Sequence, residues 1–572
     1  MKQSYLTADT ETYDGLRGQK FACGCIYNGT NTYTFTNINE FVETLLRYEY
    51  PRYKIFFHNS SFDIRFILQY CRENKILFPS GIIKGGTYIS QDIPSLKNGN
   101  LIYSKNILAL PDTKYTRIQD SYAIIQMPLE KFTKVFGLKD AKLDMDFSKA
   151  NSIETYIKRC ELDVKILYDG LGKMFELFPT TKYALSLPQA SMKEFLKDSE
   201  NFMFTTKRIK KDIVIDSLLE QEARLGYFGG RNEIFKFNYF PKVYYYDKNS
   251  LYPFVMRNNY FPVDIKEEKP NKSVLKEPLY YVNATVELPY MYVPPLPFKR
   301  DKLYFTYGKM TGWFYSPEFN IVKDMCENII INKAYSFTPS LLFKEFIDKY
   351  WNMRIKYINE NNNLQSVVKL YMNSLYGKFG QKRECENRVY VWDIAEGCEE
   401  LADGVYTKTT KSFSKSRFIN PFISGFITSY ARAELYKALD EDSIICDTDS
   451  VITAKQINNV GTDLGQFKLE GVGQFQAFAP KTYFFMTDGK ERNKAKGVYK
   501  EFIRGATPEE FINNIKRTEK YIYAKPKESI RRFGDFMNVK HIIKELSFIN
   551  NKRIILNNRD TEPYDARTIL AR

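Results

Sequence analysis

The chain has 572 residues, of which 44% are hydrophobic, 27% charged and 16% aromatic, and its formal net charge is +16. This length predicts roughly three to five packed units, and no window approaches the ~20 apolar residues of a membrane span. With no signal-like start, we expect a cytoplasmic protein. Its positive charge and many aromatic rings favour a nucleic-acid partner over a merely basic surface.

The cysteines and histidines exclude a zinc site. Eight cysteines are scattered without a C-x-x-C pair, and His58 and His541 are the only histidines. Cys23 and Cys25 alternate as strand residues of a reduced protein would. Any metal must therefore have oxygen ligands, which favours Mg²⁺ or Mn²⁺.

Residues 1–180 predict an α/β domain. Strand-like runs at Tyr5–Thr7, Lys54–Phe57 and Asn106–Leu110 alternate with helical periodicity, which is clearest over Ile153–Leu177. Residues 183–245 read as a helical connector that ends in aromatic strands.

Four carboxylates of this first domain come from three separate segments. Asp9 and Glu11 follow a short strand, Asp63 opens a helix after the second strand, and Asp163 lies within the helix 153–177. Such a set could hold two metal ions. The alternative is a group of unrelated surface acids.

Three further segments carry a second acidic set. Asp247 ends the strand-like run Val243–Tyr246, and Asp447 and Asp449 flank Thr448 directly after another apolar run. A D-x-D pair alone could be a solvated turn, but Asp247 would then be a carboxylate at the mouth of a buried strand. Metal ions held by carboxylates, with a cation facing them, are the groups that nucleotidyl transfer requires.

The cation comes from a predicted helix over Leu364–Tyr376. Val368, Met372 and Leu375 form its core stripe, and Gly377 is expected to cap its end. A neighbouring polar stripe carries a lysine, an amide and an aromatic ring, which suit a triphosphate, a sugar or base edge and a base face. These three residues are Lys369, Asn373 and Tyr376. An ordinary solvated face is the alternative.

Two insertions separate these segments, and a basic tail follows. Between Pro253 and Tyr350 a proline-rich stretch predicts a loop-built insertion, and Gly380–Arg417 predicts a β-hairpin, 388–392 against 404–409. The tail predicts a second hairpin, 545–548 against 553–556.

The segments D-K-N-S-L-Y-P at 247, K-L-Y-M-N-S-L-Y-G at 369 and C-D-T-D-S at 446 resemble motifs A, B and C of family B DNA polymerases. The resemblance implies that Asp247, Asp447 and Asp449 hold two Mg²⁺ ions, with Mn²⁺ possible. It implies that Lys369 grips the triphosphate, Tyr252 lies under the sugar, and Lys481 and Tyr483 hold the primer. The nucleotide-binding set it implies is Ser250, Leu251, Tyr252, Lys369, Asn373, Tyr376, Arg354 and Lys356.

The first acidic set resembles the 3′–5′ proofreading exonuclease of the same polymerases: D-x-E, then N-x(3)-F/Y-D, then an aspartate on a helix. The implied catalytic and metal-binding residues are Asp9, Glu11, Asp63 and Asp163, with Lys142 as a basic helper. Two departures stand out. The second motif is one residue short, and Arg159 occupies the usual tyrosine position before Asp163, with Tyr156 a turn further back.

The short chain is similar to the protein-primed, phi-29-type branch. Y-F-G-G at 227–230 resembles its Y-x-G-G linker, D-S-Y at 120–122 its S/T-L element, and T-S-Y-A-R at 428–432 its T-x-x-A/G-R segment. The implied DNA-binding residues are His58, Asn59, Phe62, Ser121, Tyr122, Tyr156, Tyr227, Gly229, Gly230, Thr428, Arg432, Lys481 and Tyr483.

The implied fold is an α/β, ribonuclease H-like exonuclease domain plus an α+β right-hand polymerase domain (palm, fingers, thumb) with two insertions. Its expected segments are the exonuclease (1–180), a connector (181–230), the first palm segment with motif A (231–258), insertion 1 as terminal-protein region (259–345), fingers with motif B (346–381), insertion 2 as strand-displacement hairpin (382–416), the second palm segment with motif C (417–530) and the thumb (531–572).

The branch implies a monomer in the cytoplasm of an infected bacterial host, replicating a linear phage genome. Expected partners are template and primer DNA, dNTPs and a terminal protein as primer, with no membrane. A nucleic-acid-primed family B polymerase is the main alternative. A stand-alone nuclease would need broken motifs A to C, and a non-catalytic DNA-binding protein would leave the seven placed acids unexplained.

Overall fold

The structure is a computed structural model. It describes residues 4–15, 18–76, 78–79, 81–84, 87–97, 100–101, 114–145, 151–198, 217–391, 398–402, 404–413, 419–458, 460–496, 498, 503–510, 517–523, 528–529, 539–545 and 552–571. The strand expected at 106–110 lies outside these residues. Within them, no helix is long and apolar enough to cross a bilayer.

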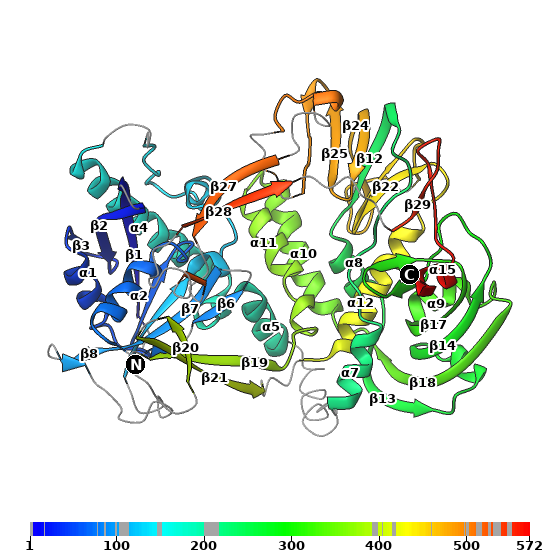
Figure 1. Ribbon diagram of the computed structural model, residues 1–572, viewed down its shortest axis with the longest axis horizontal. Coiled ribbons are helices and arrows are strands. Elements are labelled where there is room, and N and C mark those ends of the chain that lie inside the picture. The colour runs from blue at the N-terminus through cyan, green and yellow to red at the C-terminus, as the bar shows by residue number, and fades with distance from the viewer. Residues whose placement is uncertain are drawn as a thin grey trace.

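The N-terminal domain is built on a seven-stranded sheet, which confirms the expected α/β domain (Figure 1). Its order is β3 (Thr32–Phe35), β2 (Gly18–Tyr27), β1 (Ser4–Gly15), β4 (Tyr53–Phe57), β10 (Tyr115–Asp120), β7 (Thr87–Pro94) and β6 (Ile82–Lys84). Strands β1, β4 and β10 run parallel. Helix α2 spans Ile64–Glu73, and α4 covers Ile153–Leu177 as the sequence predicted.

A second seven-stranded sheet carries the later acids. Its order is β11 (Asn232–Ile234), β22 (Ser443–Asp447), β23 (Ser450–Thr453), β12 (Tyr239–Lys248), β24 (Phe467–Ala479), β25 (Thr482–Thr487) and β26 (Lys490–Glu491). Helices α8 (Leu251–Asn258), α10 (Lys344–Asn359), α11 (Leu364–Asn373) and α12 (Pro421–Tyr436) lie between this sheet and the N-terminal domain or beside it (Figure 1). Phe178, just after α4, stacks on Tyr371 of α11 with ring centroids 4.1 Å apart, so one apolar core joins both halves.

Helix α11 ends earlier than expected. It stops at Asn373, and Tyr376–Lys378 forms a separate 3₁₀ turn. Gly377 therefore lies inside that turn and is not the helix cap. The polar stripe of Lys369, Asn373 and Tyr376 therefore runs from α11 into this turn. The Tyr376 ring still lies beside the ring of Tyr252.

The first insertion is a sheet, so the expectation of a loop-built segment was wrong. Strands β13 (Phe261–Glu268), β18 (Asn328–Ser340), β14 (Tyr280–Leu288) and β17 (Gly308–Tyr315) pair antiparallel in that order. Buried side chains alternate along β14, which gives the sheet its own core. Pro294 and Pro295 fall in the connection after β14, and Pro297 begins the short strand β15 (Pro297–Lys299). Pro262 and Pro339 lie opposite each other near the ends of β13 and β18.

The second insertion is a hairpin, as predicted. Strand β19 (Glu384–Val391) pairs with β21 (Val405–Phe413), and Arg388 faces Thr409. Strand β20 (Glu399–Ala402) adds to β21, while β19 pairs with β5 (Phe78–Pro79) of the N-terminal domain. Leu401 and Val405 are buried in that domain's core, so the far end of the hairpin is docked on it (Figure 1).

The tail hairpin was expected between 545–548 and 553–556. Residues 546–548 lie outside the described residues, and the described parts pair with other strands. Strand β28 (Val539–Glu545) pairs with β27 (Arg517–Tyr523), which puts a hairpin across the expected palm–thumb boundary at 530. Strand β29 (Ile554–Ile555) pairs with β30 (Thr561–Glu562). Helix α15 (Ala566–Ala571) then packs against the first insertion. A local pattern cannot separate these pairings, because the residues of a strand do not specify its partner.

Candidate active sites

The first acidic cluster lies where β1 meets α4. Asp9 and Glu11 are two apart on β1 and so share a face of the sheet, and Asp163 comes from α4. Carboxylate oxygens of these three residues lie within 4.8 Å of one another. Asp63 accepts hydrogen bonds from the Thr10 backbone N–H at 3.0 Å and the Thr10 hydroxyl at 2.6 Å. The four predicted acids therefore converge.

Two cations oppose this negative charge. Lys142 Nζ lies 3.0 Å from Asp163 Oδ2, and Arg159 Nε lies 2.7 Å from Glu11 Oε1. Burial and then the neighbouring carboxylates of Asp63 and Asp163 raise the pKa of Asp9 well above its usual range. Burial also raises the pKa of Asp63 to about 7. Buried, mutually repelling carboxylates are a site that a cation would stabilise.

Tyr156 is not brought to this cluster. Its side chain is buried in a small apolar group with Ala22, Cys23, Cys25 and Cys160. It lies two helical turns from Asp163, roughly 10 Å along the axis. The position one turn before Asp163 belongs to Arg159, so the expectation that Tyr156 contacts DNA was wrong.

Three residues expected to hold a DNA end, Asn59, Phe62 and Tyr122, form one surface beside the acids, which we call the shelf. Asp120 accepts from the backbone N–H groups of Asn59 and Tyr122, at 2.8 and 2.9 Å. Asn59 and Tyr122 are exposed, whereas Ser121 is buried and donates to the Phe57 carbonyl. The structure thus adds Asp120, which sequence reasoning did not place in the site, as the group that joins the two loops.

His58 braces the same shelf. Its Nδ1 lies 2.9 Å from the Ser121 hydroxyl, and its Nε2 lies 3.0 Å from the Met127 carbonyl. Burial lowers the pKa of His58 to about 4. Both ring nitrogens have protein partners, so His58 positions the shelf and is not a free donor for DNA. The Phe62 ring, half-buried, packs edge-on to Phe66.

The second acidic cluster lies on the second sheet. Asp447 ends β22, Asp449 follows in a two-residue turn, and Asp247 on β12 is paired with Ser450 of β23. Thr448, at φ 64°, makes the turn tight. Burial and then Asp449 raise the pKa of Asp247 to about 6, while Lys369 opposes the rise.

Cations also face this cluster. Lys481 Nζ lies 3.1 Å from Asp447 Oδ1. Burial and Asp447 raise the pKa of Asp449, against the charges of Lys369 and Lys481. Lys369 is exposed on α11, with its charge available to a ligand. The structure thus brings Lys369 near the three acids, where a cation was expected, and it also places Lys481, which was expected to hold the primer, beside Asp447.

The predicted nucleotide pocket is only partly assembled. The Tyr252 and Tyr376 rings stack with centroids 4.3 Å apart and planes 5° apart. Arg354 donates to the Ser250 hydroxyl at 3.0 Å. Among the described residues, Asn373 Oδ1 is buried without a hydrogen-bond partner, so it is open to a ligand donor.

Two residues of the predicted pocket do not reach it with their side chains. Leu251 is buried in the core and can offer only its backbone. Lys356 lies two residues after Arg354 on α10, about 200° around the helix, and its ammonium is 3.9 Å from Glu360. Arg354 and Lys356 therefore lie on different sides of α10.

The T-x-x-A-R segment is buried, which overturns its expected contact with DNA. Arg432, 3% exposed, donates to both carboxylate oxygens of Glu318 and to the carbonyls of Phe228 and Gly229. Thr428 is also buried and donates to the Gly425 carbonyl. Arg432 thus joins the Y-x-G-G linker to Glu318 of the first insertion from the buried side of α12.

The linker itself approaches the catalytic turn. A Cβ on Gly230 would lie 2.8 Å from Thr448 Cγ2, whereas one on Gly229 would meet nothing within 4 Å. Gly229 is exposed, and Tyr227 is half-buried against Gly380. Glycine is thus required at 230 because the backbone there passes close to the protein's own turn between β22 and β23. Tyr483, also predicted to hold DNA, is largely buried behind Lys481.

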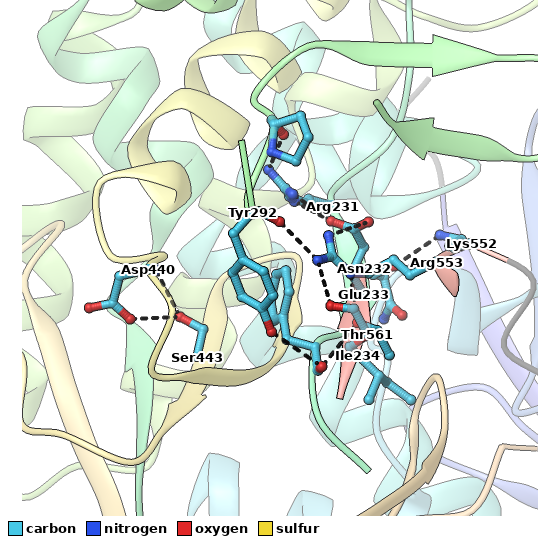
Figure 2. Close-up of polar contacts among 12 residues, drawn as sticks. Arg231, Asn232, Glu233, Ile234, Tyr292, Asp440, Ser443, Lys552, Arg553 and Thr561 are labelled. Atoms are coloured by element: carbon cyan, nitrogen blue, oxygen red, sulfur yellow. Dashed lines mark hydrogen bonds and ion pairs between the residues drawn. The ribbon is translucent and has the colours of Figure 1, made fainter. Parts of the chain in front are cut away.

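Sequence reasoning missed a set of buried charges behind the catalytic hairpin. Arg231, Glu233 and Arg553 are almost fully buried (Figure 2). Arg231 follows the linker glycines, which is a weak local signal. Nothing local marks Arg553, because its partners Glu233 and Tyr292 lie hundreds of residues earlier in the sequence.

Comparison with known proteins agrees with this geometry. The chain is 27% identical over 541 residues to a probable DNA polymerase of Neurospora intermedia (78% of this chain, 52% of the relative). It is 26% identical over 437 residues to a DNA polymerase of Acidianus bottle-shaped virus (70% and 59%). It is 28% identical over 476 residues to the DNA polymerase of Bacillus phage phi29 (75% of each). The chain thus spans little more than half the length of the first two relatives.

Among solved structures, phi29 DNA polymerase complexed with primer-template DNA and incoming nucleotide substrates gives a TM-score of 0.73 at 20% identity, covering 95% of this chain and all of the other. This likeness shows the fold and confirms the expected exonuclease-type domain joined to a right-hand polymerase domain. The family model for DNA polymerase type B, organellar and viral, matches residues 149–461, more than half of the chain. The protein therefore belongs to the type B DNA polymerases of organelles and viruses.

Proposed function

We propose that the protein is a template-directed DNA polymerase with a 3′–5′ proofreading exonuclease, which replicates a linear phage genome by protein priming with strand displacement in an infected bacterial cell. The observation that carries the proposal is the pair of acidic clusters. Each combines three or four buried or half-buried carboxylates with cations, and each sits in the domain where the family's fold would place that activity.

The donor sets fit divalent ions. Each cluster offers only carboxylate oxygens, and burial together with mutual repulsion raises the pKa values of Asp9, Asp247 and Asp449. Asp9, Glu11, Asp63 and Asp163 would hold Mg²⁺ or Mn²⁺ in one site, and Asp247, Asp447 and Asp449 in the other. Bound there, two ions would supply Lewis-acid activation of the attacking oxygen and neutralise charge on the phosphate.

The chain's own residues would then divide the work of synthesis. Lys369 binds the triphosphate as a point charge, and Arg354 holds the motif A loop through Ser250. The stacked pair Tyr252–Tyr376 forms a flat wall against the sugar and base. Lys481 holds Asp447 and is exposed enough to contact the primer backbone.

In the proposed exonuclease, the shelf of Asn59, Phe62 and Tyr122 receives an unpaired DNA end, on which aromatic rings can stack. Lys142 keeps Asp163 oriented toward Asp9. A frayed end is favoured over a paired one because only unstacked bases can reach such a shelf.

Primer extension with purified protein, Mg²⁺, dNTPs and a primed template tests polymerisation. Omitting the oligonucleotide and adding the candidate terminal protein with labelled dNTPs tests priming, and a label bound covalently to that protein is the expected result. Extension of the oligonucleotide without such labelling would replace protein priming by nucleic-acid priming. No incorporation in either reaction would refute the proposed function.

A further inference from the structure

The end of the chain lies along the edge of the catalytic sheet. Strand β11 is the edge strand beside β22, which carries Asp447. The Thr561 backbone N–H donates to the Phe235 carbonyl at 2.9 Å, and its hydroxyl lies 3.1 Å from the Ile234 carbonyl. The Phe237 N–H donates to the Arg559 carbonyl at 2.9 Å. The segment 552–561 therefore lies against β11 and the residues that follow it.

Behind β11, buried charges join these distant segments (Figure 2). Arg231 Nε donates to Glu233 Oε2 at 2.7 Å, and Arg553 Nη1 lies 3.9 Å from Glu233 Oε1. Both arginines are 1% exposed, and Glu233 is not exposed at all. Lys552 donates to the Asn232 carbonyl at 2.9 Å.

Burial of these charges is unfavourable, so nearby contacts must offset the lost hydration. Three cations surround one carboxylate, and desolvation of buried ions costs several kcal/mol each unless hydrogen bonds compensate. Several of their other N–H groups donate to fixed oxygens nearby, while Arg553 Nη1 and Glu233 Oε1 have no hydrogen-bond partner among the described residues. Arg231 donates to Pro294 at 2.9 Å, and Arg553 donates to Tyr292 at 2.8 Å and to the Thr561 hydroxyl at 2.7 Å. Planar guanidinium groups bonded in this way fix several strands relative to one another.

The backbone held by the cluster is the one on which the catalytic turn rests. The Thr448 N–H donates to the Arg231 carbonyl at 2.7 Å. Asn232 is paired with Asp447 and Glu233 with Cys446. A movement of β11 would therefore move the two carboxylates that flank Thr448.

We propose that Arg553 is a positioning residue for polymerisation, which holds β11 through Glu233 and so places Asp447 and Asp449 for the metal ions and primer. The inference rests on the proposed function. In this role Arg553 supports the chemistry of the turn at Thr448, which lies about a hundred residues earlier in the sequence. Arg553 touches neither DNA nor nucleotide in this role, and it acts only through the strand.

The decisive variant is Arg553→Met. It keeps the bulk of the side chain and leaves Glu233 paired with Arg231, so the fold should persist. Arg567→Met is the matched control, since Arg567 lies in the same segment but is exposed and paired only with nearby Asp565. Arg553→Lys keeps the charge but not the planar fork, and should fall between parent and Arg553→Met.

Single-nucleotide addition should show a kcat about tenfold or more below the parent for Arg553→Met, because small displacements of reacting groups are costly. The KM for dNTP should change less than about twofold, since Lys369 and Tyr252 are untouched. Digestion of single-stranded DNA, which uses the other domain, should match that of the parent. Arg567→Met should match the parent in all three.

Hydrogen exchange gives a readout that does not depend on activity. In Arg553→Met the amides of 443–453, including Thr448, should lose protection while those of β1 and α4 keep it. Parent-like kcat with parent-like exchange at 443–453 would overturn the proposal. So would equal losses in synthesis and digestion with protection lost throughout, in Arg553→Lys as well as Arg553→Met, because Arg553 would then serve stability alone. A parent that adds no nucleotide would refute the proposed function, and the exchange result would still decide whether Arg553 holds the hairpin.

Discussion

The two acidic clusters are supported in different ways. In the N-terminal cluster, the acids, their cations and the bracing residues all come from one domain, within residues 9–163. In the second cluster, the acids lie on a sheet whose edge is held by the first insertion and by Lys552 and Arg553. The first site is thus locally complete, whereas the second depends on contacts spread along the whole chain.

The clusters also differ in how their charge is balanced. Glu11 and Asp163 each have a buried or half-buried cation within 3.0 Å. Asp247 has no such ion pair among the described residues, and Lys369 acts on it only at longer range. Asp447 is paired with Lys481 at 3.1 Å, so both clusters have part of their charge paired with a cation, and they differ in which acids are left without a close ion pair.

The largest effect should separate the two sites. Asp247→Ala, Asp447→Ala or Asp449→Ala should reduce nucleotide addition by about a thousandfold or more, because too few ligands remain to stabilise the transition state. Digestion of single-stranded DNA should persist. Glu441→Ala, an exposed acid just before β22, is the control in the same extension assay. Near-normal extension by one of the three variants would remove that acid from the site.

The converse variant should give a similarly large loss on the other side. Asp9→Ala combined with Glu11→Ala should abolish excision and leave primer extension intact, with more mismatches retained because editing adds discrimination that binding alone lacks. Gel assays of single-stranded DNA digestion and of mismatch extension measure both. Undiminished digestion would contradict the assignment of the first cluster.

A smaller change should test the charge balance of the first site. Arg159→Ala removes the cation on Glu11, so we expect the Mg²⁺ concentration for half-maximal digestion to fall about threefold, the order expected when one competing charge is lost. Lys158→Ala removes an exposed neighbouring cation and should change nothing. A higher Mg²⁺ requirement would show that Arg159 supports the site rather than competing with the ions.

The docked hairpin links the two regions and can be removed. Replacing 384–414 by a short glycine linker should leave single-nucleotide addition largely intact, while copying through duplex DNA and product length per binding event fall several-fold. Leu401 and Val405 leave the N-terminal core in this variant, so digestion of single-stranded DNA is needed as a control for that domain. Strand displacement equal to that of the parent, under a competitor trap, would show that the hairpin is not the wedge.

The smallest effect concerns His58. Its imidazole should titrate near pH 4 rather than 6.5, because burial disfavours the charged form. The unfolded chain takes up this proton at higher pH, so the stability present above pH 6.5 is lost progressively as the pH falls toward about 4. Two-dimensional NMR of the only two histidines, assigned with His58→Gln, measures the titration. A normal His58 titration would show that the ring is not held between Ser121 and Met127.

The sequence alone identified those catalytic residues that belong to a recognisable local pattern. The D-x-D turn, the strand ending at Asp247 and the helix carrying Asp163 are each set by a few neighbouring residues, and the structure has each element where it was expected. Helical periodicity even predicted the ends of α4 correctly, since Ser152 caps its first turn.

Only the tertiary structure decided which polar residues face a site and which are buried as supports. Arg432 and Thr428 looked like DNA contacts but are enclosed by the first insertion, and Arg553 showed no local signal although it joins Glu233 from the far end of the chain. Hydrogen bonds and ion pairs between distant segments depend on how strands pair across the sheet, and a strand's own residues do not specify its partner. The catalytic carboxylates are therefore local in sequence, while the structure that positions them is not.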